Sequence, residues 1–400
     1  TPVGRLIHSG DFKIDETPVV GDPFNRPLWE EVSKDGVKAL ICDSTNVFSP
    51  LPGRSENTIG DAIAEMMSNA TGTVVATTFA SNIARLKTLA LAAKKANRSV
   101  VLLGRSMQRM VEAATQVGIL SGFPPIVSPE DALNMPRNSI MLLVTGSQGE
   151  RRAASAQLAQ GKYLGLSLKD GDTFLFSSKT IPGNERGVIR IMNQLSELGV
   201  DVIDDAGGKY HVSGHANRPD LATMHEIVKP EMLIPMHGEH RHLRERVKLG
   251  EQSGIKGIVA VNGMMIDLTG DRQFVAEYIE TGRTYLDGSV KVGAMDGVVR
   301  DRIRMALNGQ MVVTLILDEN DEPLGDPWVE ISGLSETGKS NTSLAEVVEA
   351  DLAQFLGRAN DKTLRDDVKL EKELKNVARK SAQGEIGKKP EVIVIVSRLS

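Results

Sequence analysis

Two histidine-bearing loops, each placed after a strand-like segment, constrain the fold of this chain more than any other feature. Six of its seven histidines lie between His211 and His242. Apolar and turn-forming residues lead into His215, a short apolar run leads into His237, and residues 220–228 between them have apolar side chains at helical spacing. This strand–helix–strand order predicts that both loops emerge at one edge of a sheet, where α/β proteins place their sites.

Two aspartates near the N-terminus occupy similar positions. Residues 4–8 and 37–42 read as strands, and Asp11 and Asp43 follow them. A single aspartate after a strand is usually a turn former or a helix cap. Imidazole, however, is the commonest metal ligand and is well suited to proton transfer near neutral pH. The two aspartates therefore become site candidates if their strands neighbour the histidine loops.

Composition bounds the class of protein. With 400 residues, 40% hydrophobic and 25% charged, the chain is long enough for two or three globular domains. Its single cysteine, Cys42, excludes a disulfide framework and fits a reducing cytoplasm. No apolar run reaches about 18 residues, so no membrane span is predicted.

Charge gives no global signature of nucleic-acid binding, because the net charge is −5 and the pI is about 5.9. A narrow basic channel can still bind phosphates, since local potential governs a site. Taken singly, each local candidate is more often a solvated surface charge. The candidates are Arg54, Arg85, Arg105, Lys179 and Arg218.

Residues 47 to about 205 predict a separate α/β block. Several buried-looking strands there end in small polar residues at a helix start, as at 145–150 and 177–179. Free N–H groups and the helix dipole at such ends favour anions, although ordinary helix capping is the better explanation of any one loop. Because Arg105 and Lys179 stand at two of these ends, a phosphate-binding wall is plausible.

Four motifs occur in order along the chain: His-Ser-Gly-Asp-Phe-Lys (8–13), Cys-Asp-Ser-Thr-Asn (42–46), Ser-Gly-His-Ala (213–216) and Met-His-Gly-Glu (236–239). Together they resemble ribonuclease J, a family of bacterial RNases in the β-CASP branch of the metallo-β-lactamase superfamily. No single motif is decisive, but the resemblance covers essentially the whole chain.

The resemblance implies an α/β architecture. A partial metallo-β-lactamase αββα fold is expected over residues 1–46 and 206–282, interrupted by a β-CASP α/β domain over 47–205. A small α+β C-terminal domain is expected over 290–400. For that domain the residues themselves predict a hairpin over 312–331, helices over 343–358 and 362–382, and a strand over 391–396.

The resemblance also implies roles for four residues. Asp11 matches the aspartate that bridges two metal ions, and His237 matches a histidine that ligates one of them. His215 matches the histidine that contacts the scissile phosphate or protonates the leaving oxygen, with Asp43 orienting it. Two zinc ions per site are implied, with manganese or magnesium as alternatives.

The implied substrate is RNA, especially with a 5′-monophosphate, and His237 in place of valine is similar to the RNA-cutting members of the superfamily. The implied assembly is a homo-oligomer formed through the C-terminal domain. The substrate-binding candidates are His211, Val212, Ser213, Gly214, His215, Ser147, Ser178 and Lys179.

One departure is large. Most metal ligands of the resembled family lie in an upstream His-x-His-x-Asp-His motif and one further histidine, and neither is present in this sequence. Because the sequence starts abruptly at Thr1, we expect a natural N-terminal segment to precede it and these 400 residues alone to be inactive.

Three functions compete at this stage. The leading one is a metal-dependent ribonuclease, both 5′-to-3′ exonuclease and endonuclease, in cytoplasmic RNA processing and decay. The second is a non-catalytic RNA-binding paralogue that serves as a partner subunit. The third, a hydrolase of small esters or lactams, is disfavoured because such substrates do not need the block over 47–205.

Some features are expected to carry no chemistry. Residues 333–340 match the P-loop pattern, but the preceding strand reads as half of a hairpin and only 60 residues follow. Residues 257–268 predict a β-hairpin around Asn262-Gly263. Whether Asp287 holds a structural cation is a question that the sequence does not answer. Structural or surface roles are expected for His8, His225, His240 and His242.

Overall fold

The computed structural model describes residues 1–204, 207–270, 274–294 and 296–399. The chain divides into two compact units, Thr1–Ile279 and Glu280–Ser400. Across those four described ranges, no helix combines the length and the apolarity needed to cross a membrane. The first unit contains two parallel sheets, which establish the mixed α/β fold expected from the sequence.

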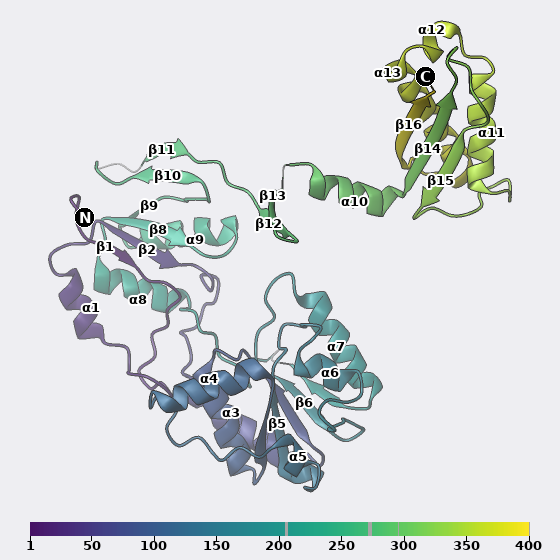
Figure 1. The fold of residues 1–400 in the computed structure, drawn as a ribbon. Coiled ribbons are helices and arrows are strands. Elements are labelled where there is room, and N and C mark those ends of the chain that lie inside the picture. Colours follow the sequence, from purple (N-terminus) through teal and green to yellow (C-terminus); the bar gives the residue numbers. More distant parts are fainter. Residues whose placement is uncertain (205–206, 271–273, 295, 400) are drawn as a thin grey trace. The chain divides into compact units, whose positions relative to one another are not determined.

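The first sheet has the strand order β1-β2-β8-β9, and all its strands are parallel. Helices α8 and α9 lie beside it, and α1 contacts α8 (Figure 1). Ile7, Leu40 and Leu233 of the strands form one buried core with Leu221 of α8 and Leu249 of α9. The elements are β1 (Leu6–His8), α1 (Arg26–Ser33), β2 (Ala39–Asp43), α8 (Arg218–Val228), β8 (Met232–Met236), α9 (His240–Gln252) and β9 (Lys256–Gly257).

The second sheet lies between the two halves of the first in sequence and has the strand order β4-β5-β3-β6-β7, again all parallel. Its central strands are buried on both faces, which is why they read as continuous apolar runs. The strands are β3 (Val74–Thr77), β4 (Ser99–Leu103), β5 (Ile140–Val144), β6 (Thr173–Phe176) and β7 (Asp201–Ile203).

Helices cover both faces of this second sheet (Figure 1). One core joins alternate strand residues to α2, α3 and α4, and the other joins the remaining strand residues to α5, α6 and α7. Phe174 and Leu175, neighbours on β6, belong to opposite cores because side chains alternate along a strand. The helices are η1 (Glu56–Thr58), α2 (Gly60–Asn69), α3 (Ile83–Lys95), α4 (Arg105–Gln116), α5 (Pro129–Ala132), η2 (Arg137–Ser139), α6 (Ala154–Ala159) and α7 (Glu185–Glu197).

The hairpin predicted around Asn262-Gly263 is wrong. These two residues do form a tight turn, closed by the Met264 N–H donating to the Val261 carbonyl at 3.1 Å. The residues before the turn do not pair with those after it, because β9 has already joined β8 in the first sheet. Instead β10 (Met264–Asp267) pairs antiparallel with β11 (Phe274–Tyr278).

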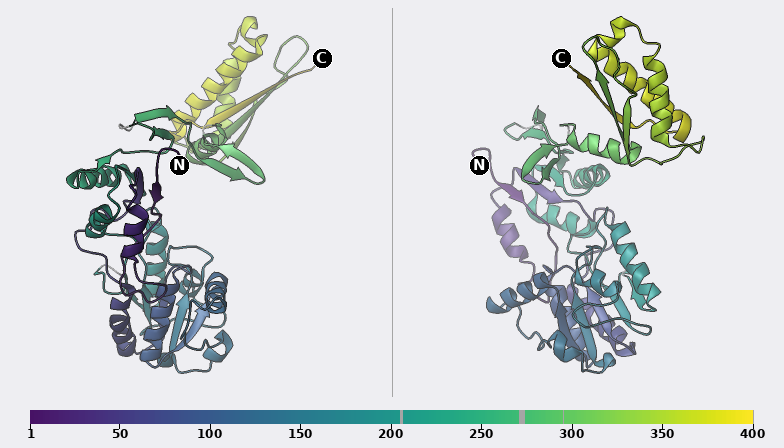
Figure 2. Two further views of the ribbon diagram at one scale, coloured as in Figure 1. Left: turned by 90° about the vertical axis from the view of Figure 1, so that its left-hand side faces the viewer. Right: turned by 45° about the vertical axis from the view of Figure 1, so that its right-hand side comes forward.

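The second unit is built around a three-stranded sheet of order β15-β14-β16, with β14–β15 antiparallel and β14–β16 parallel. Figure 2 shows the helices on one side of this sheet. The hairpin, the first helix and the final strand lie where the sequence predicts them, whereas the single helix predicted over 362–382 is two helices, α12 and α13. The elements are β12 (Thr284–Asp287), β13 (Val290–Gly293), α10 (Val298–Asn308), β14 (Gln310–Leu317), β15 (Trp328–Ser332), α11 (Leu344–Leu356), α12 (Asp361–Leu364), α13 (Asp367–Ile386) and β16 (Glu391–Arg398).

On the other face of this sheet, Ile316, Trp328, Ile393 and Ile395 are exposed. The homo-oligomer expected through this domain stays a prediction, because the structure contains one chain. The P-loop pattern follows antiparallel strand β15 and ends four residues before α11, so it lacks strand–loop–helix geometry. Asp287 accepts two hydrogen bonds from Arg302, at 3.0 and 2.8 Å, which occupy the carboxylate left open as a cation ligand.

His225 of α8 is a buried histidine that stays neutral in the folded protein. Its Nε2 lies against the guanidinium of Arg246, which is itself fully buried, and its Nδ1 is 3.4 Å from the Ser253 hydroxyl. Burial, together with the charge of Arg246, lowers the pKa of His225 from 6.5 to about 3. The expectation of a structural role for His225 agrees with this environment.

Replacing His225 with Gln should make stability less sensitive to acid. Between pH 6.5 and about 3 the unfolded chain binds a proton at His225 that the folded chain does not, so stability falls as pH falls. One such group contributes up to about 1.4 kcal/mol per pH unit. Urea unfolding between about pH 7 and 5 should show a shallower loss for His225→Gln. Equal losses in both proteins would contradict the assignment.

Candidate metal and acid–base site

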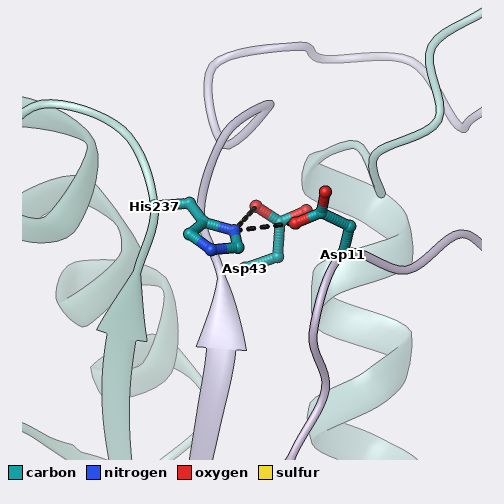
Figure 3. Close-up of side chains that lie close together, drawn as sticks. All are labelled: Asp11, Asp43 and His237. Carbon is teal, nitrogen blue, oxygen red and sulfur yellow. Dashed lines mark ion pairs between the residues drawn. The ribbon is translucent and has the colours of Figure 1, made fainter.

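Three side chains meet where neighbouring parallel strands end. Asp43 is the last residue of β2, Asp11 lies in the loop after β1, and His237 directly follows β8. The His237 Nδ1 lies 2.9 Å from the Asp11 Oδ1 and 3.7 Å from the Asp43 Oδ1 (Figure 3). The order β1-β2-β8 thus brings His237 next to two aspartates that are distant from it in sequence.

Asp43 is the buried member of this cluster, with 1% of its side chain exposed against 61% for Asp11. Its Oδ1 accepts hydrogen bonds from the Thr45 N–H at 2.9 Å and the Thr45 hydroxyl at 2.7 Å. Its Oδ2 lies 2.7 Å from the His215 Nδ1. Burial alone would raise the pKa of Asp43, but the hydrogen bonds from His215 and Thr45 outweigh it and lower that pKa. Asp43 is therefore ionised at neutral pH.

The same contact raises the pKa of His215. The hydrogen bond with Asp43 is the largest cause, burial opposes it, and the charges of Asp43 and Asp11 add to the increase while Lys179 opposes it. Because Nδ1 faces Asp43, Nε2 is the ring nitrogen left for a substrate. The arrangement therefore holds an imidazole that carries a proton more readily than an isolated one.

The loop carrying His237 has an unusual backbone. His237 itself has φ of 62°, a left-handed conformation that side-chain-bearing residues seldom adopt. Gly238 follows with φ of 83°, and a Cβ there would lie 2.9 Å from the His242 side chain. Such conformations persist where the surrounding structure requires them, which often happens at functional sites. This turn aims the imidazole at the carboxylates.

A cleft of about 570 Å³ lies in the first unit beside His215. It lies between the two segments that connect the sheets, one after β2 and one before α8, and the strand ends of the second sheet. Lys179 is exposed, and its ammonium forms no ion pair with a described residue. The Ser178 hydroxyl is buried, and no described group hydrogen-bonds to it. These donors suit a phosphate. The predicted residues that line the cleft are Ser178, Lys179, His211, Val212 and Ser213.

The remaining substrate-binding candidates lie outside the lining of this cleft. Gly214 is exposed in the same loop, and His215 is placed at Asp43 as described above. Ser147 is buried after β5, so its contact with substrate stays a prediction. Its neighbour Gln148, which sequence reasoning missed, donates to the Lys179 carbonyl at 3.1 Å and accepts from the Ile181 N–H at 2.8 Å. Gln148 thereby braces the Lys179 loop.

Asn46 is a second residue that sequence reasoning missed. Its side-chain N–H₂ lies 2.8 Å from the Ser213 hydroxyl, 3.2 Å from the His215 carbonyl and 2.9 Å from the Asn217 amide oxygen. It belongs to the Cys-Asp-Ser-Thr-Asn motif, which is the only signal that pointed to it. Asn46 fixes the loop that carries His215 to the end of β2.

Two of the basic candidates are not surface charges. Arg85 is fully buried and ion-paired with Glu56, so the expectation of a solvated side chain is wrong for it. Arg218 is half-buried and lies 2.9 Å from Glu245. Arg54 lines the cleft, and Arg105 is exposed at the start of α4. The burial of Arg85 was not predicted because its partner Glu56 is distant from it in sequence.

The other histidines occupy structural or surface positions, as the sequence suggested. The His8 Nδ1 accepts from the Gly10 N–H at 3.1 Å, which closes the turn that leads to Asp11. The His242 Nδ1 accepts from the Glu239 N–H at 3.0 Å and caps α9, while His240 is exposed. None of these three residues belongs to the cluster around Asp43 within the described part of the chain.

The donor atoms of this cluster fit the implied metal in type. Ligand atoms of Asp11, Asp43 and His237 lie within 4.8 Å of one another, and two carboxylates with one imidazole suit zinc or manganese. Asp43 had been expected only to orient His215, so its membership of this group adds to that expectation. Three donors form part of a shell, fewer than two four-coordinate ions require. The residues therefore fit a metal site to which other ligands contribute.

Comparison with known proteins agrees with this geometry. Residues 71–195 match the ribonuclease J β-CASP domain, residues 208–260 match a Zn-dependent metallo-hydrolase RNA specificity domain, and residues 297–399 match the ribonuclease J C-terminal domain. These matches lie within the predicted domains, whose boundaries stay predictions.

Whole-chain similarity points to the same family. The chain is 35% identical to ribonuclease J of Sinorhizobium meliloti over its whole length, covering 71% of that relative. It is 34% identical to ribonuclease J of Corynebacterium glutamicum over 88% of this chain and 50% of the relative, and 31% identical to that of Mycobacterium tuberculosis over 89% and 64%. The chain belongs to the ribonuclease J family of β-CASP metallo-hydrolases.

Proposed function

We propose that this chain is part of a metal-dependent ribonuclease that hydrolyses RNA phosphodiesters, both from the 5′ end and internally. The observation that carries the proposal is the Asp43 carboxylate, which contacts the His215 imidazole on one oxygen and faces His237 with the other. A proton-carrying group and a set of metal-ligating groups are thus held side by side. The names of the relatives, all ribonuclease J, support RNA as the substrate.

Each residue of the site has a chemical part in this proposal. Zinc or a related divalent ion, held in part by Asp11, Asp43 and His237, would supply an activated water and offset charge on the phosphoryl oxygens. His215 gives the proton from Nε2 to the leaving oxygen, and Asp43 holds its ring through Nδ1. Ser178, Lys179 and Ser213 bind the phosphates of the RNA in the neighbouring cleft.

The alternative is a non-catalytic RNA-binding subunit with the same fold. An experiment on the full-length protein distinguishes the nuclease from the non-catalytic subunit. The full-length protein is needed because this chain spans between 50% and 71% of the three relatives named above. Cleavage of 5′-monophosphorylated, end-labelled RNA with zinc or manganese would establish the nuclease. Binding of that RNA without cleavage would replace it with the non-catalytic subunit.

Replacing His237 with Ala should remove a metal ligand. In the full-length protein, RNA cleavage should fall at least about 100-fold, and the bound metal measured by mass spectrometry should fall with it. His240→Ala is the matched control, because His240 is exposed three residues further along and lies outside the cluster. If His237→Ala and His240→Ala had equal metal content and equal activity, His237 would not be a metal ligand.

Replacing His215 with Ala should remove the proton donor. Cleavage of RNA should slow about 100-fold or more, within the range of general acid catalysis. A nucleotide p-nitrophenyl phosphodiester should be affected much less, because its leaving oxygen departs without a proton. An equal loss on both substrates would show that His215 does not act as the acid.

A further inference from the structure

Arg85 is a fully buried arginine in the core of the first unit. It lies in the first turn of α3, and its guanidinium forms a two-pronged ion pair with Glu56 of η1, with N–O distances of 2.5 and 2.9 Å. Glu56 belongs to the segment by which the chain enters the second sheet. A buried arginine needs such a partner, since an unpaired charge in the interior costs several kcal/mol.

The remaining donors of Arg85 reach two other segments. Its Nη1 donates to the Ser177 carbonyl at 2.7 Å and to the Ser177 hydroxyl at 3.1 Å. Its Nη2 donates to the Val212 carbonyl at 3.2 Å, and the Ser177 hydroxyl in turn donates to the Tyr210 carbonyl at 2.7 Å. One rigid guanidinium therefore joins the entry segment, the end of β6 and the segment by which the chain returns.

Both loops held by Arg85 carry phosphate-binding candidates. Ser178 and Lys179 directly follow Ser177, while His211 and Ser213 flank Val212. All four line the same cleft. The guanidinium lies behind that cleft, because Arg85, Ser177 and Val212 are buried. It touches the backbone of both loops and the Ser177 hydroxyl, and its hydrogen bonds do not involve the side chains of Ser178 and Lys179.

We propose that Arg85, paired with Glu56, is a positioning residue that fixes the 177–179 and 210–213 loops relative to each other so that their side chains bind one RNA strand. This inference rests on the proposed function. The fork geometry of arginine suits the task, because several donors leave one plane in fixed directions, which the single ammonium of lysine cannot reproduce. Preorganised loops bind more tightly, because less entropy is lost when the ligand arrives.

The chain supplies a matched control in Arg98. It is also buried, at 5% exposure, and donates to the carbonyls of Met67, Ala70, Gly72 and Ile140. Gly72 precedes β3 and Ile140 begins β5, so these two carbonyls lie at the amino ends of the strands, opposite the edge where Ser177 lies, while Met67 and Ala70 belong to the carboxyl end of α2. Loss of Arg98 should destabilise the same sheet without disturbing the loops.

The test uses three variants of the full-length protein. Glu56→Leu/Arg85→Met removes both charges together, which a core tolerates better than the loss of one partner. Arg85→Lys keeps the charge without the fork, and Arg98→Met is the control. Hydrogen–deuterium exchange of residues 207–216 reports the loop, and anisotropy of a labelled 5′-monophosphorylated RNA in EDTA reports its affinity.

The double variant should exchange faster over 207–216 and bind the RNA about tenfold more weakly, equivalent to about 1.4 kcal/mol. Arg85→Lys should bind the RNA with an affinity between those of the parent and the double variant. If the double variant does not fold, the affinity of Arg85→Lys tests the positioning role instead. Arg98→Met should melt earlier yet keep the exchange of 207–216 and the affinity of the parent. This pattern would support the proposal.

Two results would overturn the positioning role of Arg85. One is unchanged exchange over 207–216 in the double variant. The other is a double variant that binds RNA as tightly as a parent that does bind. A parent that fails to bind RNA at all is a different result, since it would sink the proposed function and the role of Arg85 with it.

Discussion

The buried carboxylate of Asp43 is the interaction on which the site depends. A charged group with 1% exposure is stable only when its oxygens are hydrogen-bonded, and here Thr45 and His215 provide those bonds. The consequence is reciprocal: Asp43 stays ionised, and the pKa of His215 rises. Because His237 and Asp11 stand on the open side of the same carboxylate, the proposed acid–base pair and the proposed metal ligands both contact Asp43 or one of its neighbours.

The topology places Asp43 next to the cleft that we propose binds RNA. Strand β2 ends at Asp43, and the chain then leaves for the second sheet and returns just before His215. The two crossings run side by side and are tied by Asn46 and Asn217 on one side and by Arg85 on the other. The cleft between them therefore lies beside His215. A site on two such crossings is sensitive to anything that moves one relative to the other.

Much of this was accessible from the sequence because its signals are local or ordered. Parallel strands that are buried on both faces appear in the sequence as apolar runs. The residue after each run therefore lies at the carboxyl end of a strand, where α/β proteins place their sites. That logic, with the four ordered motifs, singled out Asp11, Asp43, His215 and His237. The geometry that links Asp43 to both histidines follows from the pairing of β1, β2 and β8, which the sequence alone does not state.

What the sequence did not reveal depends on long-range partners. Arg85 reads like any helical surface arginine until Glu56, Ser177 and Val212 surround it. Gln148 and Asn46 give no composition signal at all, since an amide is ordinary in a loop. The hairpin prediction at Asn262-Gly263 was wrong for the same reason. The turn forms, but the strand before it, β9, pairs with β8. Local patterns predict elements, whereas pairing decides which elements meet.

Anomalous X-ray diffraction at the zinc edge, on crystals of the full-length protein grown with zinc, tests the central claim most directly. We expect an anomalous peak bonded to Asp11, Asp43 and His237, with the second oxygen of Asp43 still holding His215. A fully occupied zinc peak bound elsewhere, with these residues bonded only to one another, would contradict it.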